Sequence, residues 1–339
     1  MYTEKLKSYV IDLDDDESER WRKVIHQERS AMRALAEEAI EDMKEMSSLT
    51  MSPVLHYLFS LFYRTSGGRY FRELKSIADA MGVSASLATV MNCTYELSHY
   101  GEWVSPFGCT AGAHWVDGLG MVHARNMDWP LENIGKATRL FRFVEGSREF
   151  LSVGIAGFVG VLSGMVPGSY SVTINWAPPT EAPRFDWGPS FLLREVLATC
   201  DTYEEAVEEL STSSLATSVF FLVCGTQKGQ ACVIERTQDL YALREMGRGP
   251  LVQANHHVLR DFLDNNASLH EEDVDGCNVY EDSHDRRMCL QRELKKVKRA
   301  QSLDEIGKCL DVEPVHNEFS YQQMVFHPES GEVKVWRWS

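Results

Sequence analysis

The apolar residues of this chain change their spacing at Cys109, and this change limits the folds that the chain can adopt. Before Cys109 they recur at three- and four-residue steps, which places them on one face of a helix. The pattern predicts four helices, with Asp16 as the N-cap of the first and Gly82 at the end of the third. Their predicted ranges are 17–47, 53–63, 69–80 and 84–98.

From Cys109 onward the spacing is typical of short strands. Asp117-Gly118 joins two runs within 109–129 and predicts a hairpin. Further strands are predicted at 139–144, 149–153, 158–163 and 169–175, in a meander over 217–255 and in a hairpin around Ser330-Gly331. Helices are predicted at 188–199, 202–210, 285–297 and 302–310, and the acidic stretch 261–284 is predicted to be a surface loop. This order predicts an α+β fold, an αββα sandwich of two antiparallel sheets that follows a helical N-terminal segment.

The overall charge narrows the possible partners. The 339 residues carry a formal net charge of −16 without a compensating Lys/Arg cluster, which argues against binding to a nucleic-acid backbone.

The most apolar run, 54–63, is shorter than the roughly 18 residues that a membrane span needs. The N-terminus has no apolar signal core, and the 8 cysteines form no C-x-x-C pair. We therefore expect a cytoplasmic protein with reduced thiols, and a lysosomal or secreted one only if a signal segment has been removed.

The first hairpin carries residues that can perform chemistry. Cys109 follows the small Gly108, and Arg125 and Asp128 are predicted just past the end of the second strand. Because that end returns beside the start of the first strand, we expect Arg125 and Asp128 to lie beside Cys109. A thiol attacks as its thiolate, which a neighbouring guanidinium favours. Asp128 can orient an α-amine, and an amine freed at Cys109 can act as the base for its own thiol. The pattern predicts cleavage after Gly108.

These residues resemble a known family. Cys-Thr at the start of a strand, followed after a hairpin by A-R-N-M-D-W (124–129), looks like the cholylglycine hydrolase and acid ceramidase family of N-terminal nucleophile hydrolases. The similarity extends over nearly the whole chain. It includes the segments 81–97, 157–175, 202–237 and V-Q-A-N-H-H (252–257).

The resemblance implies roles for particular residues. Cys109 would be the nucleophile, positioned by Arg125 and Asp128, and Asn255 would donate to the oxyanion with Asn175 close by. It also implies two chains, a helical one of residues 1–108 and a catalytic one of residues 109–339.

The family's late arginine is harder to place in this sequence. Arg286 is the candidate, although an alignment on Met288-Cys289-Leu290 would put Ser283 or His284 at that position.

Two features depart from the ceramidase-like members. Their Asn at the position of Asn175 is followed by Glu, where this chain has Trp176, and a short Pro-rich stretch (176–190) replaces their apolar insertion. We therefore expect a less lipid-like substrate, with a short or polar acyl group. Trp129 and Trp176 are expected to line the pocket, although tryptophan more often packs in a core.

Simpler interpretations stay open for each residue. Cys109 can be an inert buried thiol, Arg125 and Asp128 a structural ion pair, and Asn255 a turn residue. The spacing of His256-His257, His284 and Cys289 matches no zinc pattern, so we expect no metal site.

The sequence as a whole predicts an autoprocessing cysteine amidase that needs no cofactor and hydrolyses a small N-acyl amide through a Cys109 thioester. Its expected partners are that substrate and its own cleaved N-terminal chain. Two alternatives remain: an acyltransferase that passes the acyl group to an amine, and a non-catalytic relative that keeps the fold for binding.

Overall fold

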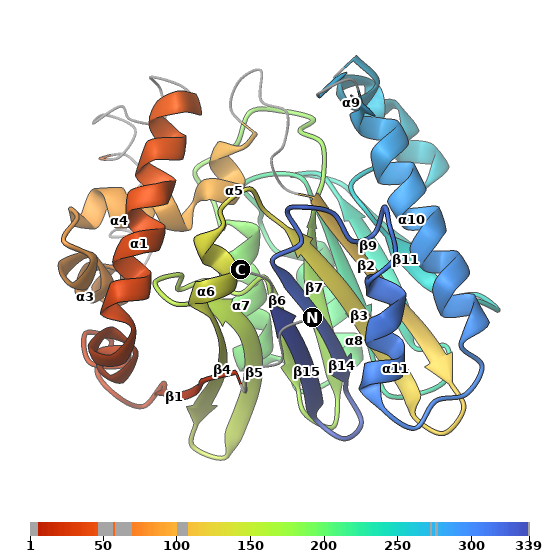
Figure 1. Ribbon diagram of the computed structural model, residues 1–339, viewed down its shortest axis with the longest axis horizontal. Coiled ribbons are helices and arrows are strands. Elements are labelled where there is room, and N and C mark those ends of the chain that lie inside the picture. The colour runs from red at the N-terminus through yellow and green to blue at the C-terminus, as the bar shows by residue number, and fades with distance from the viewer. Residues whose placement is uncertain are drawn as a thin grey trace.

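The structure is a computed structural model that describes residues 6–46, 57, 70–99, 108–271, 273–274 and 277–337. Two sheets lie face to face, and helices cover the outer face of each (Figure 1). The predicted αββα sandwich is therefore confirmed.

The smaller sheet has five strands in the order β11-β2-β3-β14-β15. They span Leu251–Gln253, Gly108–Val116, Gly120–Asp128, Gln322–His327 and Glu332–Arg337. Both predicted hairpins are confirmed, since β2 pairs with β3 and β14 with β15, each antiparallel. The helices α10 (Val279–Lys296) and α11 (Leu303–Gly307), with the 3-10 turn η2 (Lys308–Leu310), cover the outer face of this sheet.

The larger sheet has eight strands in the order β1-β4-β5-β6-β7-β8-β9-β10. They span Ser8–Asp12, Thr138–Glu145, Arg148–Ile155, Ser163–Val166, Tyr170–Trp176, Val219–Cys224, Ala231–Arg236 and Tyr241–Glu245. The helices α7 (Pro189–Thr199) and α8 (Tyr203–Thr212) pack against it, and α6 (Asn133–Ala137) precedes β4.

The described part of the N-terminal segment is mainly helical, but its helices begin and end at other residues than predicted. The first helix, α1, spans Arg22–Met46, so Asp16 is not its N-cap; Asp16 accepts hydrogen bonds from Ser18 in a turn before it. The helix α3 (Phe71–Met81) ends at Gly82, whose φ of 78° a residue with a side chain rarely adopts. The predicted helix 84–98 is divided into α4 (Ala85–Asn92) and α5 (Thr94–Leu97). The predicted helix 53–63 lies outside the described residues apart from Tyr57.

The sequence pattern missed the first strand of the chain. Strand β1 pairs in parallel with β4 and so makes the N-terminal segment part of the larger sheet. Five residues without a turn signal give too little periodicity to mark a strand.

Two other predictions are wrong. Residues 158–162 do not form a strand, and β6 begins only at Ser163. Two of their N–H groups bind outside the sheet: that of Val159 donates to the Asn92 side chain, and that of Val161 donates to the carbonyl of Ser190. The carbonyl of Leu162 accepts from both Arg125 and the N–H of Ile174.

The acidic stretch 261–284 is not a loop but folds into η1 (Arg260–Asn266), α9 (Ala267–Glu271), the short pair β12 (Asp273–Val274) and β13 (Cys277–Asn278), and the start of α10. Its anchors are the buried Phe262, Leu269 and Asn266, and the Asn266 side chain binds both the N–H and the carbonyl of His257. Isolated anchors of this kind give no periodic signal.

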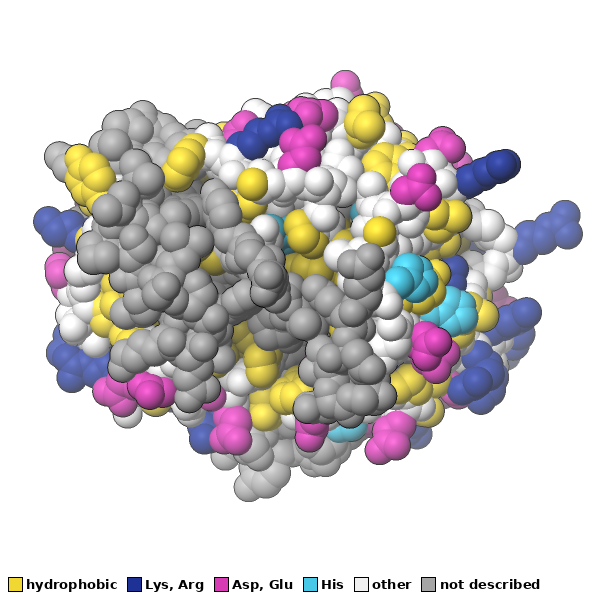
Figure 2. Space-filling model, turned by 90° about the horizontal axis from the view of Figure 1, so that it is seen from above, with side chains coloured by type: hydrophobic (Ala, Val, Ile, Leu, Met, Phe, Trp, Pro, Cys, Tyr) yellow, Lys and Arg dark blue, Asp and Glu magenta, His cyan; other side chains and the backbone are white. Residues whose placement is uncertain are grey.

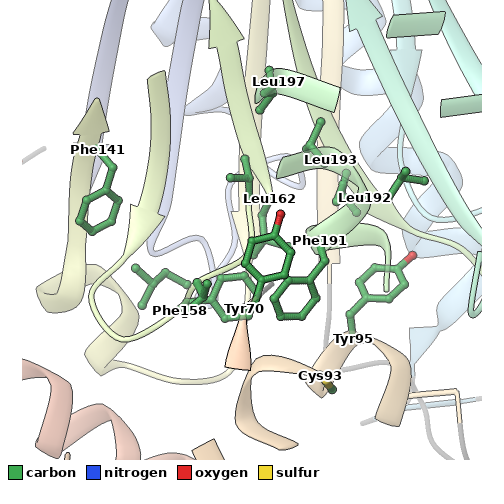
Figure 3. Close-up of a cluster of buried hydrophobic side chains, with 14 of the residues drawn as sticks. Tyr70, Cys93, Tyr95, Phe141, Phe158, Leu162, Phe191, Leu192, Leu193 and Leu197 are labelled. Carbon is green, nitrogen blue, oxygen red and sulfur yellow. The ribbon is translucent and has the colours of Figure 1, made fainter. Parts of the chain in front are cut away.

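The N-terminal segment and the rest of the chain share one hydrophobic core. Trp21 packs edge-on against Phe141 of β4, with ring centroids 5.3 Å apart. The Tyr70 ring lies 5.0 Å from Phe191 of α7, and Figure 3 shows the two rings side by side. The described residues of the N-terminal segment therefore bury apolar side chains against the rest of the molecule.

A buried ion pair also joins the two parts. Glu73 of α3 is fully buried and accepts two hydrogen bonds from Arg194 of α7, at 2.7 and 2.9 Å, and others from Trp21 and Arg20. Burial alone would raise the pKa of Glu73, but Arg194 and these hydrogen bonds outweigh it and lower the pKa. The stabilisation is therefore fully present above the usual carboxyl pKa and is lost as the pH falls through the lowered one.

Charged side chains of both signs are interspersed around the described part of the face shown in Figure 2. The net charge is therefore not gathered into one block on this face. Within the described ranges, the structure contains no helix long and apolar enough to cross a membrane.

We predict that Glu73→Gln lowers the free energy of unfolding by about 3 kcal/mol, because the buried Arg194 loses its counter-charge. Urea-induced unfolding measures this loss. The control is Glu149→Gln, which removes a pair with Arg142 whose side chains are 37% and 49% exposed and should cost less than about 1 kcal/mol. Equal losses in the two variants would contradict the role of Glu73.

Candidate active site

The β2–β3 hairpin brings the candidate residues together. Gly108 lies opposite Asp128 in the register, Cys109 opposite Met127, and Ala111 opposite Arg125. Arg125 and Asp128 thus lie within the second strand, not past its end as predicted. Their return to the neighbourhood of Cys109 is as expected.

Arg125 is buried and contacts the candidate nucleophile. Its Nη2 lies 3.3 Å from the Cys109 Sγ and also donates to the carbonyl of Ile174 at 2.6 Å. Its Nη1 donates to the carbonyl of Leu162 at 2.6 Å and to the hydroxyl of Ser163. These neutral acceptors fix the guanidinium without neutralising it, so its positive charge remains available to a thiolate.

Asp128 forms hydrogen bonds with residues other than Arg125. The carboxylate accepts hydrogen bonds from Ser320 and Asn317, which precede β14. It also lies against Gly108: a Cβ on Gly108 would come within 2.9 Å of the Asp128 Oδ2. Burial raises the pKa of Asp128, and the nearby Arg286 guanidinium opposes the rise. Only glycine leaves room for this carboxylate beside the peptide bond that precedes Cys109.

Asn255 and Arg286 meet at the main chain of Cys109. The Oδ1 of Asn255 accepts from the N–H of Cys109 at 2.9 Å and from the Nη2 of Arg286 at 3.1 Å. The Nδ2 of Asn255 donates to the carbonyl of Trp176 at 2.9 Å. Two donors at one end and an acceptor at the other fix the orientation of the carboxamide. Among the described residues, the second hydrogen on Nδ2 has no hydrogen-bond acceptor, so it can donate to an oxyanion.

The structure places Arg286, rather than Ser283 or His284, at the site. Its Nη1 donates to the Cys109 carbonyl at 3.0 Å and to the Thr110 hydroxyl at 2.9 Å. Ser283 binds the backbone of Asn255, and the His284 side chain is 47% exposed.

Asn175 lies behind this group. Its Nδ2 donates to the carbonyls of Gln253 and Ala254, at 3.1 and 3.2 Å. Both amide hydrogens therefore have backbone acceptors, which suits a residue that supports the segment before Asn255 better than one that binds an oxyanion.

The predicted tryptophans line a small pocket beside Cys109. Its free volume is about 20 Å³, room for one water molecule. The lining consists of Tyr95, Cys109, Arg125, Met127, Trp129, Phe158, Leu162, Ile174 and Trp176. Trp129 and Phe158 also line a second apolar cavity of about 50 Å³, which faces α1 and α3. The pocket is mainly apolar.

Sequence reasoning missed several contacts of the site. Tyr95 comes from the N-terminal segment, and its hydroxyl donates to the carbonyl of Ser218 at 3.1 Å, on the pocket wall. The similarity over 81–97 could have indicated its importance. Ser320 and Asn317 carry no local signal, since only the fold brings them to Asp128. Among the described residues, no group of three or more His, Cys, Asp or Glu side chains is placed to hold a metal ion.

Comparison with known proteins finds that this chain is similar to acid amidases and acid ceramidases. An N-acylethanolamine-hydrolyzing acid amidase of Caenorhabditis elegans is 27% identical over 247 residues, which cover 69% of this chain and 68% of that protein. Human acid ceramidase is 25% identical over 285 residues, covering 73% of this chain and 69% of that protein. This chain is a homologue of the acid amidases and acid ceramidases. No protein-family model matches the chain.

A solved structure of such a homologue has a fold similar to that of this chain. The Caenorhabditis elegans ortholog of N-acylethanolamine-hydrolyzing acid amidase superposes with a TM-score of 0.56 at 22% identity, over 68% of this chain and 100% of that one. The resemblance seen in the sequence is thus confirmed, whereas the roles of the individual residues stay predictions.

We predict that Arg125→Lys slows alkylation of Cys109 by iodoacetamide at neutral pH by about tenfold, because the thiolate loses a guanidinium donor. Peptide mapping by mass spectrometry measures the rate at this cysteine. Lysine is preferable to alanine at this position, because alanine would leave several buried acceptors unpaired and would destabilise the folded protein. The control is Arg139→Lys, a buried arginine that binds Glu28 instead. Equal rates in wild type and Arg125→Lys would show that the thiolate does not depend on this contact.

Proposed function

We propose that this protein is a cysteine amidase that cleaves itself after Gly108 and then hydrolyses a small N-acyl amide. One observation carries the proposal: the Sγ and the N–H of Cys109, directly after Gly108, are each bound by a different candidate side chain, Arg125 and Asn255. An inert core thiol needs neither contact.

Self-cleavage would begin with the Cys109 thiol. Its Sγ attacks the Gly108 carbonyl carbon, the C–N bond to Cys109 breaks, and the nitrogen takes a proton to become a free amine. Water then hydrolyses the resulting thioester and leaves a carboxylic acid at Gly108 and the thiol at Cys109. The Asp128 carboxylate, which lies beside Gly108, would orient the new amine.

Hydrolysis of the substrate would follow the same chemistry. The Cys109 amine takes the proton from its own thiol, Sγ attacks the amide carbon of the substrate, and the amine part leaves with a proton. Water hydrolyses the thioester to release the acid. The free hydrogen on the Asn255 Nδ2 would stabilise the oxyanion, and donors of this kind contribute about 3 kcal/mol.

The pocket lining favours an apolar acyl group. The expectation of a short chain rests on the short Pro-rich stretch 176–190. The lining does not favour a polar chain, since the guanidinium of Arg125 is already bound to protein acceptors. The acyl group of the proposed substrate is therefore small and apolar, and the amine part stays open.

We predict that purified protein contains two fragments, residues 1–108 and 109–339, that separate only on denaturation, because the shared core holds them together. Intact-mass analysis under denaturing conditions detects the cut. Cys109→Ala should remain one chain and be inactive, and Cys109→Ser should cut slowly, since a hydroxyl is the weaker nucleophile. A fully active enzyme that stays a single chain would disprove this mechanism.

We predict that wild-type protein hydrolyses short-chain N-acyl amides faster than ceramides, and that Phe158→Ala shifts this preference toward longer acyl groups. The ring of Phe158 borders both cavities, so its removal should join them. Release of the free acid from a panel of acyl lengths measures the preference. The control, Phe150→Ala, removes a buried ring stacked on Phe143 and should leave the preference unchanged. A ceramide as the best wild-type substrate would contradict the prediction.

A further inference from the structure

Helix α10 contacts Asn255 at two points one turn apart. Arg286 donates to the side-chain Oδ1, as described above. Ser283 is fully buried, and its Oγ accepts a hydrogen bond from the main-chain N–H of Asn255 at 2.8 Å. The helix therefore binds both the side chain and the backbone of this residue.

A buried histidine lies within hydrogen-bond distance of the Ser283 hydroxyl. The Oγ of Ser283 lies 2.7 Å from the Nδ1 of His256, whose side chain is buried against Tyr280. Burial, with the nearby positive charge of Arg287, lowers the pKa of His256 to about 3, so the ring is neutral near neutral pH. The Oγ can accept from Asn255 and donate its own hydrogen to Nδ1, and in that arrangement the ring carries its hydrogen on Nε2.

We propose that Ser283 is a positioning residue of the amidase and acts through Asn255. The inference rests on the function proposed above. The hydroxyl of Ser283, oriented by His256, holds the backbone of Asn255 so that its carboxamide faces Cys109. Without this acceptor, the N–H of Asn255 would be buried and unpaired, and its segment would have to shift to find another partner. Such a shift would move the oxyanion donor, and small displacements of such donors are costly to the rate.

The kinetic test compares two buried serines that each bind a neutral histidine. Ser283→Ala should lower kcat about tenfold to a hundredfold with little change in KM, since the lost contact matters mainly in the transition state. Ser171→Ala is the matched control, because the Ser171 hydroxyl binds His123 at 2.9 Å between the sheets. It should leave kcat unchanged. A kcat of Ser283→Ala within twofold of wild type would overturn the proposal.

A second pair of variants separates hydrogen bonding from packing. His256→Asn keeps an acceptor at the place of Nδ1, whereas His256→Leu has nearly the same shape and no acceptor. The leucine variant should lose kcat as Ser283→Ala does, and the asparagine variant should stay within about threefold of wild type. Equal losses in both would assign these residues to packing alone and overturn the proposal. This comparison stands even where Ser283→Ala fails to fold.

Amide hydrogen exchange gives a readout that needs no activity. Exchange of the Asn255 N–H, followed by NMR, should accelerate in Ser283→Ala and His256→Leu but not in Ser171→Ala. Unchanged exchange would overturn the positioning role. A wild-type protein that hydrolyses no amide in the panel would instead overturn the proposed function, so the two failures are distinguishable.

Discussion

The antiparallel register of β2 and β3 sets the geometry on which the rest of the site depends. It places Asp128 opposite Gly108 and Arg125 two positions beyond the Cys109–Met127 pair. In a sheet, a slip of one residue would move every side chain to the opposite face. Cys109 would then leave the space between the sheets, where Arg125 reaches its sulfur. The neighbours of the hairpin in the sheet, β11 and β14, hold it in this register.

The N-terminal segment contributes to the same site and is more than a cover. Tyr95 lines the Cys109 pocket, and Ser98 accepts a hydrogen bond from the indole of Trp176 at 3.0 Å. His99 packs against the same indole, with ring centroids 5.3 Å apart. Together with the buried Glu73–Arg194 pair, these contacts join the segment to the residues that face the thiol. A cut after Gly108 would therefore free a new N-terminus without dismantling the pocket wall.

Much of this arrangement could be predicted because it is local or periodic. The Asp117-Gly118 turn and alternating apolar residues predicted the hairpin, and the hairpin alone brought Arg125 and Asp128 to Cys109. The partners of Asp128 could not be predicted in this way, because Ser320 lies 192 residues away in sequence. Backbone acceptors carry no sequence signal either: nothing at Leu162 indicates that its carbonyl accepts from Arg125 as well as from the N–H of Ile174.

The sequence resemblance implies a glutamate where this chain has Trp176, and the indole gives the pocket an apolar wall at this position. A carboxylate at this place would need a donor or a counter-charge, and Arg125, which lines the same pocket, already binds carbonyls through both terminal nitrogens of its guanidinium. The indole needs only one acceptor, which Ser98 supplies, and the main-chain carbonyl of Trp176 accepts from Asn255. This position thus supplies a main-chain acceptor to Asn255 while its side chain is apolar. Recognition of the substrate inside the pocket then rests on shape, and polar recognition of the amine part has to come from outside it.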